Sequence, residues 1–382
     1  MEEAEHFCRL RQKEVAKIVH CGLPIPFNIV IPLFNPQWEF VICEEAILVA
    51  FRRVAESGTY VNGMECQRFE SLLSEFCQAP YAVGVASGTM ALELLLRAEN
   101  VDQGVRIVIT AHTFVAVLES ILAVNAEPLF VDIDPETWQM PIGEWSDDVV
   151  MVCHLYGGVS EAVKSSARLL YEDASQSFGG SLSGRALGTI ARAGAVSLYP
   201  TKNLSAMGDA GVIVTSDVEL AGRLRALRNH GQTRPQVHEL WGTTGRLDEL
   251  QAAILSEKLK HFSRFVEKRR QASTFYHEHL NDLPLRFPKE VPDSVSAPNL
   301  FVVRTEARDQ LQQHLRAQGI NTGTHYPTPL HVMAPYRNRP WAQVSLPHTE
   351  KLCAETLSLP LWAGITRELQ IQVINAVRDF FA

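Results

Sequence analysis

A lysine and an aspartate each lie just beyond a short apolar run that has the composition of a buried strand. Lys202 follows the run that ends at Leu198 and precedes a loop of small residues at 208–211. Asp173 follows the run 168–171. A lone lysine is most often a solvated surface charge, so the argument depends on the pair. An amine that can form a Schiff base and a carboxylate that can keep a pyridine nitrogen protonated are what pyridoxal phosphate chemistry needs.

A third polar element precedes both residues in the chain. The tripeptide Ser87-Gly88-Thr89 separates the apolar run 81–86 from a strongly helical run that follows it. A turn from strand to helix presents free backbone N–H groups and the positive end of the helix dipole, and both bind phosphate. Helix capping by the hydroxyl groups is the simpler interpretation of this tripeptide taken alone. The order of phosphate turn, acid and lysine is what favours a cofactor site.

Short β-rich apolar runs alternate with helical runs along the first two thirds of the chain. This alternation is typical of a mostly parallel sheet that has helices on both faces. The predicted strands are 81–86, 105–109, 127–131, 148–153, 168–172, 194–198 and 211–215. The predicted helices are 42–56, 64–77, 88–98, 114–124, 217–229 and 247–261. We therefore expect an α/β fold in which the three polar elements lie at strand ends.

The composition shifts toward proline and polar residues between residues 283 and 299, and a smaller domain is expected to begin there. Its predicted elements are a strand at 299–304 and helices at 307–318 and 366–381. The predicted domain boundaries are 1–28 for an N-terminal extension, 29–255 for a large cofactor-binding domain and 256–382 for a small C-terminal domain. We also expect a short helix at 7–19, and an entry strand or a buried arm at 27–34.

The overall composition excludes several classes of protein. The chain has 382 residues, a net charge of −8, 46% hydrophobic and 20% charged residues, as an ordinary globular protein with two packed subdomains would have. It has no basic stripe, so no nucleic-acid partner is expected. The seven cysteines are scattered without a C-x-x-C pair, which is typical of reduced thiols, and no metal-ligand spacing is found. The acidic start is unlike a signal peptide and no run could cross a bilayer, so we expect a cytoplasmic protein with no membrane partner.

Seven short motifs occur in order along the chain. They are Thr113-Phe114, Phe130-Val131-Asp132-Ile133-Asp134, His154-Leu155-Tyr156-Gly157, Glu172-Asp173-Ala174-Ser175-Gln176, Tyr199-Pro200-Thr201-Lys202-Asn203-Leu204, Arg228-Asn229-His230-Gly231 and Arg246-Leu247-Asp248-Glu249-Leu250-Gln251-Ala252-Ala253. This series resembles the successive motifs of the sugar aminotransferases of the DegT/StrS type, which are fold type I pyridoxal phosphate enzymes. The resemblance runs from about Ile31 to the C-terminus. It implies a mostly parallel seven-stranded sheet with a smaller C-terminal α/β domain.

Two segments depart from the family's pattern. After His-x-Tyr-Gly the family continues with Gln-Pro-Ala and a longer crossover, whereas here Gly158-Val159-Ser160 leads through a short segment to Leu169. We therefore expect one helix on a face of the sheet to be shortened. The asparagine that the family carries before Arg246 is replaced by Thr243-Thr244-Gly245, which puts the contact of that asparagine in question.

The resemblance implies a role for each polar residue near the strand ends. Lys202 would hold pyridoxal 5′-phosphate as a Schiff base and then move a proton between the substrate carbon and the cofactor. Asp173 would pair with the pyridinium nitrogen, and Gln176 would hydrogen-bond the ring's phenolic oxygen. The phosphate would be held by Ser87, Gly88, Thr89 and Ser197. A helix-capping role for Asp173 and an outward-facing polar position for Ser197 are the structural alternatives.

Four further residues are assigned by the resemblance alone. Phe114 would stack on the cofactor ring, although core packing would explain an aromatic residue there equally well. Asn229 would reach the phosphate from the neighbouring subunit, which implies a homodimer with shared active sites, and its alternative is a helix C-cap. His325 and Tyr326 belong to a His-Tyr-Pro element and would lie on the substrate side, where a surface or capping histidine is the competing interpretation.

The resemblance implies transfer of an amino group from L-glutamate to a keto sugar nucleotide, in amino-sugar biosynthesis for an antibiotic or a surface glycan. The loop Gly208-Asp209-Ala210-Gly211 resembles the sequence of 3-keto enzymes more than the Gly-Glu-Gly-Gly of 4-keto enzymes, which predicts amination at C3. A 4-keto sugar nucleotide, or a keto sugar or cyclitol without a nucleotide, stays open as the acceptor. A non-catalytic cofactor-binding regulator is the alternative from another class. Lys202 argues against the family's dehydratases, in which histidine replaces this lysine.

Overall fold

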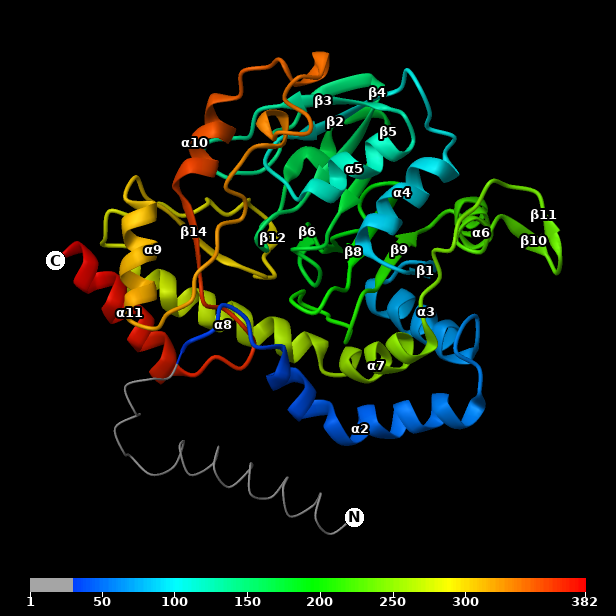
Figure 1. Ribbon diagram of the computed structural model, residues 1–382, viewed down its shortest axis with the longest axis horizontal. Coiled ribbons are helices and arrows are strands. Elements are labelled where there is room, and N and C mark those ends of the chain that lie inside the picture. The colour runs from blue at the N-terminus through cyan, green and yellow to red at the C-terminus, as the bar shows by residue number, and fades with distance from the viewer. Residues whose placement is uncertain (1–29) are drawn as a thin grey trace, which may run out of the picture.

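A seven-stranded sheet forms the centre of the molecule (Figure 1). The computed structural model describes residues 30–382, so the helix expected at 7–19 lies outside the described residues. The strands of the sheet are β1 (Tyr81–Val85), β2 (Arg106–Thr110), β3 (Glu127–Val131), β4 (Glu144–Cys153), β5 (Ser166–Asp173), β8 (Ala193–Ser197) and β9 (Gly211–Thr215). Each of the seven predicted strands overlaps one of these, because each is an apolar run long enough to cross the core once.

The strand order is β1-β9-β8-β5-β4-β2-β3. β9 is antiparallel to both of its neighbours, and the other six strands run in one direction. The predicted α/β fold with a mostly parallel sheet is therefore confirmed. Because the parallel strands share a direction, the carboxyl ends of β1, β2, β4, β5 and β8 lie along one edge of the sheet.

Helices cover both faces of the sheet. One face packs against α4 (Gly88–Ala98), α5 (Val115–Ala123) and α6 (Val218–Leu227), and the other against α3 (Met64–Cys77), α7 (Glu249–Leu259) and the start of α8 (Phe262–Leu280). Successive side chains of β4 pack in the two cores alternately: Met151 packs on the first face and Val152 on the second.

A second, smaller sheet lies beyond α8. It consists of β13 (Phe301–Arg304) and β14 (Thr356–Leu359), which pair antiparallel, and it packs with α9 (Arg308–Ala317), α11 (Arg367–Phe381) and the end of α8. Ile31 forms a single parallel bridge with Ile320 and is only 2% exposed, which agrees with a buried arm at this point of the chain. The predicted strand at 299–304 and helices at 307–318 and 366–381 match β13, α9 and α11.

Between α9 and β14 the chain packs against the large sheet through the segment 324–346 and α10 (Pro347–Glu355), and it then re-enters the small sheet at β14. This segment contains two short 3-10 turns, Leu330–Val332 and Pro340–Ala342. The Leu330 N–H donates to the Ala111 carbonyl at 2.9 Å. The Asp132 carboxylate accepts the N–H groups of His348 and Thr349, in the first turn of α10, at 2.9 and 2.8 Å. Partial burial raises the pKa of Asp132, but these hydrogen bonds outweigh it and hold the pKa below its usual value.

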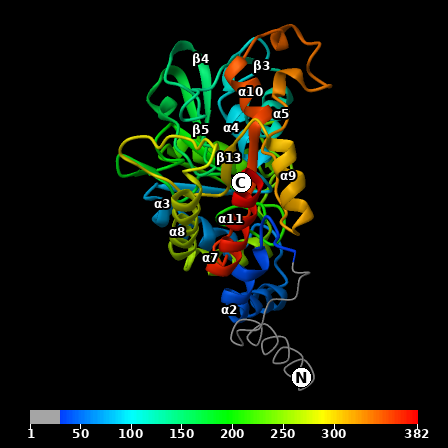
Figure 2. The same cartoon turned by 90° about the vertical axis from the view of Figure 1, so that its left-hand side faces the viewer.

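One expected feature is present, and two helices differ from the prediction. The crossover from β4 to β5 contains only the 3-10 helix η1 (Glu161–Lys164), which agrees with the shortened helix expected there. Helix α2 (Pro36–Ser57) begins well before residue 42, and in both views it lies beneath α7 at the lower end of the molecule (Figures 1 and 2). Helix α8 was not predicted.

The remaining short strands are β6 (Ser181–Leu182), β7 (Arg185–Ala186), β10 (Gln232–Arg234), β11 (Val237–His238) and β12 (Ser294–Val295). Within residues 30–382, no helix is long and apolar enough to cross a membrane.

Candidate active site

A cavity of about 500 Å³ lies at the edge of the large sheet where the parallel strands end. Ten of the eleven predicted site residues line it: Ser87, Gly88, Thr89, Phe114, Asp173, Gln176, Ser197, Lys202, His325 and Tyr326. The exception is Asn229. The topology explains the convergence, because residues that follow β1, β5 and β8 are far apart in the sequence but adjacent along one edge.

The turn between β1 and α4 is built to approach β8 closely. Ser87 is the N-cap of α4, and its Oγ accepts the Met90 N–H at 3.1 Å. The N–H groups of Gly88 and Thr89, in the first turn, have no acceptor within the helix. A Cβ at Gly88 would lie 2.5 Å from the Cβ of Ser197, so only glycine fits against β8 there. The turn therefore offers open N–H groups beside the Ser197 side chain, as a phosphate site requires.

Lys202 lies in the tight turn that follows β8. Its N–H donates to the Tyr199 carbonyl at 2.8 Å, and its side chain lines the cavity. Burial lowers the pKa of Lys202 to about 8, against a smaller upward effect from the negative charge of Asp173. The amine is thus far easier to deprotonate than an exposed lysine.

Asp173 ends β5, and its carboxylate is held in place locally. Its Oδ1 accepts the Ser175 N–H at 3.0 Å, and its backbone carbonyl accepts the His154 N–H at 3.0 Å. The first of these bonds is a turn contact, but Asp173 caps no α-helix here. The structure therefore leaves the carboxylate on the wall of the cavity, facing the same space as Lys202.

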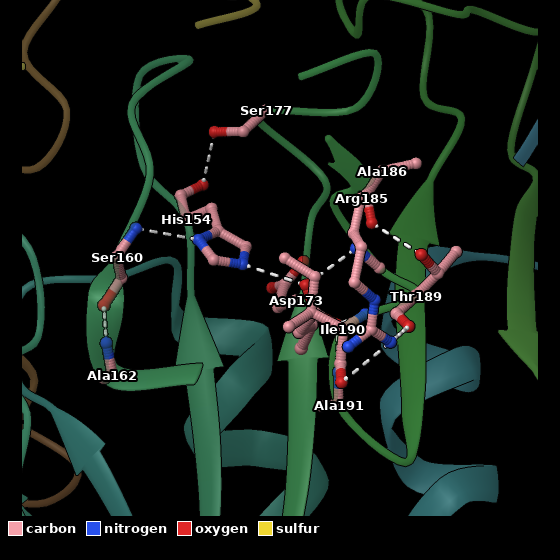
Figure 3. A network of polar contacts seen from close by, with 12 residues as sticks. His154, Ser160, Ala162, Asp173, Ser177, Arg185, Ala186, Thr189, Ile190 and Ala191 are labelled. Carbon is pink, nitrogen blue, oxygen red and sulfur yellow. Dashed lines mark hydrogen bonds and ion pairs between the residues drawn. The ribbon is translucent and has the colours of Figure 1, made fainter. Parts of the chain in front are cut away.

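A buried polar network anchors the strand beside Asp173. Glu172, which is fully buried, accepts the N–H groups of Gly188, Ile190 and Ala191, each at 2.7 Å. The His154 Nδ1 accepts the Ser160 N–H at 3.0 Å, so the proton lies on Nε2, which donates to Glu172 at 3.2 Å. Figure 3 shows the His154 ring between Ser160 and the strand that carries Asp173. Hydrogen bonds therefore link the end of β5 to the residue that follows β4 and to the loop 188–191.

Gln176 has a fixed orientation on the cavity wall. Its Oε1 accepts the Tyr156 N–H at 2.9 Å, so its amide nitrogen points the other way and donates to the Tyr326 hydroxyl at 2.8 Å. Burial raises the pKa of Tyr326, and the charge of Asp173 raises it further. Tyr326 is therefore a neutral phenol at any physiological pH.

His325 lies next to Tyr326 on the same wall. Its Nδ1 is 2.8 Å from the Ser358 Oγ, and its carbonyl accepts the Tyr156 hydroxyl at 2.6 Å. Burial lowers the pKa of His325 to about 4, and the charge of Lys202 lowers it as well. The imidazole is thus neutral near pH 7 and is bonded to Ser358 of β14, while its backbone carbonyl is bonded to Tyr156, which does not fit a solvated surface histidine.

Phe114 is not a core residue. It is the N-cap of α5, its side chain is 51% exposed, and it lines the cavity with its ring centroid 5.7 Å from that of Tyr326. The position leaves one face of the ring available to a planar ligand in the cavity.

Asn229 does not reach the cavity of its own chain. Its Oδ1 accepts hydrogen bonds from Asn62 and Arg246 at 3.3 and 2.8 Å, and its Nδ2 donates to Gln232 at 2.8 Å. Helix α6 ends at Leu227 and its C-cap is Arg228, so Asn229 is not the capping residue itself. The asparagine that the family carries before Arg246 is absent from this chain. Here the Arg246 side chain donates to Asn229.

Sequence reasoning missed several residues of the cavity. Phe34, Tyr199, Asn299 and Thr324 line it as well. Phe34 comes from the arm and packs edge-on against His325 at 6.4 Å. Asn299 is the last residue of the proline-rich and polar segment 283–299 that precedes β13. The composition of that segment predicted only a domain boundary. Tyr199 belongs to the lysine motif but was given no role, whereas Phe34, Asn299 and Thr324 have no local signature because each enters the site from a distant segment.

The residues present fit a phosphorylated pyridine aldehyde. One cavity contains an amine of lowered pKa, a carboxylate, an aromatic face and the open N-terminus of α4, and the close approach of Gly88 to Ser197 leaves the phosphate side free of side-chain bulk. No group of three or more metal-ligating side chains is found in residues 30–382.

Comparisons with known proteins identify a family that matches the chain. The family model described as the DegT/DnrJ/EryC1/StrS aminotransferase family matches residues 42–378. The chain is 37% identical over 362 residues to the erythromycin biosynthesis sensory transduction protein EryC1 of Saccharopolyspora erythraea, covering 91% of this chain and 99% of that protein. It is 37% identical over 345 residues to the dTDP-3-amino-3,4,6-trideoxy-alpha-D-glucose transaminase of Streptomyces venezuelae, covering 87% of this chain and 91% of that protein.

The fold is also similar to that of a solved structure. The crystal structure of DesV from S. venezuelae in complex with a ketimine intermediate superimposes with a TM-score of 0.86 at 33% identity, covering 92% of this chain and 98% of that chain.

Proposed function

The chain belongs to the DegT/DnrJ/EryC1/StrS aminotransferase family, and we propose that it transfers the amino group of L-glutamate to C3 of a keto sugar nucleotide. As a member of this family it is a pyridoxal phosphate-dependent sugar aminotransferase. The observation that carries the proposal is the convergence of Lys202, Asp173 and the open N-terminus of α4 on one cavity. The donor, the acceptor and the position of amination belong to the proposal.

The residues predicted to hold the cofactor have roles that their surroundings support. Bound pyridoxal phosphate supplies an electron sink for the carbanion that forms when the substrate carbon loses its proton. The Asp173 carboxylate keeps the proton on the ring nitrogen, and the Gln176 amide donates to the phenolic oxygen. Phe114 covers one face of the ring. The phosphate is held by Ser87, Gly88, Thr89 and Ser197.

Lys202 attaches the cofactor and, once released, carries the proton. An amine can accept a proton only in its neutral form, and the pKa of about 8 decides how much of it is neutral. An amine with a pKa near 8 is neutral to a substantial extent near neutral pH, whereas an exposed lysine is almost wholly protonated. The burial that lowers this pKa therefore raises the fraction of competent base.

Acceptor binding is assigned to the part of the cavity wall that His325 and Tyr326 form. His325 is neutral and Tyr326 stays protonated, so both can exchange hydrogen bonds with sugar hydroxyls without carrying charge. Asp209 lines the cavity, whereas Ala210 is packed in the core, so Asp209 is the residue of this loop that meets the sugar. Amination at C3 is supported by this aspartate and by the 3-amino product named for the Streptomyces venezuelae relative.

A homodimer with shared active sites completes the proposal. The apolar residues Val41, Ile42, Leu48 and Val49 form an exposed stripe along α2, since their spacing places them on one side of the helix. Trp241, beyond the hairpin β10–β11, is 89% exposed. A stripe of exposed apolar side chains on one helix is typical of a protein interface. A second copy that covers it would explain why Asn229 lies outside its own cavity, because it could then enter the neighbour's.

The experiment that tests the proposal is product analysis. The enzyme is loaded with pyridoxamine phosphate and offered matched 3-keto and 4-keto deoxythymidine-diphosphate 6-deoxy sugars, and each product is analysed by proton NMR. Lys202→Ala is the control for non-enzymatic exchange. We expect nitrogen at C3, with L-glutamate regenerating the amine form of the cofactor. Nitrogen at C4 alone would contradict the proposed position of amination. No turnover of any keto sugar would favour the alternative of a non-catalytic cofactor-binding regulator.

A further inference from the structure

The lysine turn is held by two buried asparagines that the proposed chemistry does not use. Asn203 follows Lys202 directly and is 1% exposed, and Asn299 lies just before β13 and is 3% exposed. The Asn299 Nδ2 donates to the Thr201 carbonyl at 2.9 Å and approaches the Asn203 Oδ1 at 3.4 Å. Asn299 therefore bonds to the residue before Lys202 and to the residue after it.

Asn203 continues the connection into the protein. Its Nδ2 donates to the Ala297 carbonyl at 2.8 Å and to the Phe178 carbonyl at 3.2 Å. Both of its N–H donors are thus used, which fixes the orientation of the amide and directs its oxygen to Asn299. The segment 297–299 and the turn 201–203 are linked through three side-chain hydrogen bonds, of which two are buried and the bond from Asn299 to Thr201 is partly buried.

The turn has few backbone bonds of its own. The Lys202 N–H donates to the Tyr199 carbonyl, and the Ala206 N–H donates to the Leu198 carbonyl, while the Thr201 carbonyl is bound by the Asn299 side chain. A surface turn of this length could move freely. The two carboxamides replace the backbone ladder that would hold a strand or helix, so the path of the chain through Lys202 depends on them.

We propose that Asn299 is a positioning residue for Lys202: together with Asn203 it holds the turn 201–203 so that the lysine side chain enters the cavity at the height of the cofactor. The pair also couples the lysine to the segment that leads from α8 into the small sheet. This inference rests on the proposed role of Lys202. An amine positioned by its backbone reacts as an intramolecular group, and a displacement of about 1 Å can cost about a hundredfold in rate.

Attachment of the cofactor measures this positioning directly. Apoenzyme is mixed with pyridoxal phosphate, the absorbance of the lysine-bound cofactor is followed over time, and borohydride reduction with peptide mass mapping quantifies the label on Lys202. The variants are Asn299→Ala and Asn299→Ser, the second being a smaller loss of hydrogen bonding. Val373→Ala, in the core of the small sheet and distant from the lysine turn, is the control that lowers stability without touching the turn.

We expect both Asn299 variants to attach the cofactor about 10 to 100 times more slowly, while Val373→Ala attaches it at the wild-type rate despite a lowered melting temperature. Asn203→Ala should slow attachment similarly, and the double variant Asn203→Ala/Asn299→Ala should add little to either. Wild-type attachment rates in folded Asn299→Ser would overturn the inference and leave the pair a purely structural contact. A variant that does not fold is replaced in the comparison by the other Asn299 variant. Label on another lysine in the wild-type protein would instead overturn the proposed function, so the two failures are distinguishable.

Discussion

Replacing Gly88 by alanine tests whether the turn before α4 holds the phosphate. The added Cβ would lie 2.5 Å from the Ser197 Cβ and 3.0 Å from the Ser197 Cα. Because the second of these atoms belongs to the backbone, no side-chain rotation can relieve the contact. The turn and β8 must separate by about 0.9 Å to reach the 3.4 Å at which ordinary van der Waals contact begins.

Two consequences follow for the Gly88→Ala protein. Overpacking of this kind costs about 1–3 kcal/mol of the free energy of unfolding. The same displacement moves the N–H groups of Gly88 and Thr89 away from Ser197, and loss of one hydrogen bond to a charged phosphate costs about 1.5–3 kcal/mol, which weakens binding by about 10 to 100 times. We therefore expect the Kd of pyridoxal phosphate to rise by that factor, measured by titration of the apoenzyme.

Gly222→Ala is the matched control, because a Cβ at Gly222 in α6 would meet no atom within 4 Å. Alanine in a helix interior should raise the free energy of unfolding by about 0.5–1 kcal/mol and leave the Kd unchanged. A wild-type Kd in Gly88→Ala would refute the phosphate assignment even if its stability falls, since the site would then tolerate the displacement that the structure predicts to be harmful.

Three further predictions concern the acid, the dimer and the pH dependence of stability. Asp173→Asn should fold and bind pyridoxal phosphate but lose transamination by several orders of magnitude, because an amide cannot stabilise the protonated ring; near-normal turnover would place the nitrogen's partner elsewhere. Mixing Lys202→Ala and Asn229→Ala chains should restore part of the activity through subunit exchange, because a mixed dimer would contain one site with both residues intact. Verified exchange without recovery would show that Asn229 does not act in the neighbouring subunit's site. The pKa of Asp132 is lowered in the folded state, so its contribution to stability is complete above about pH 4 and is lost as the pH falls through the folded-state value. The melting temperature of Asp132→Asn should therefore lie below that of the wild type at pH 7, and the gap should narrow as the pH falls; a gap of the same size at every pH would contradict the role of the Asp132 carboxylate as acceptor of the α10 N–H groups.

The sequence predicted the large sheet because its strands are continuous apolar runs, which a strand buried on both faces must be. The cavity followed from the same reasoning, since Ser87, Asp173 and Lys202 each end or follow such a run. Helix α8 was missed because most of its residues are polar and charged. Its buried residues Phe262, Val266, Arg269 and Tyr276 are nevertheless spaced by three, four or seven, which is the helical signal that the composition obscured.

Residues that enter the site from distant segments could not be predicted in this way. Phe34 and Asn299 have no motif around them, and their places depend on how the arm and the segment before β13 pack. Asn229 needs a second chain before any role in catalysis can be assigned. The boundary between residues 255 and 256 stays a prediction, and it would fall within α7.

The most direct test of the account is to locate the cofactor on the chain. The purified protein, loaded with pyridoxal phosphate, is reduced with borohydride and its peptides are mapped by mass spectrometry, with and without prior addition of L-glutamate. We predict the pyridoxyl label on Lys202 alone, and its loss when L-glutamate has first converted the cofactor to the free amine form. Label on a different lysine, or label on Lys202 that L-glutamate does not remove, would contradict the assignment of this cavity as the aminotransferase site.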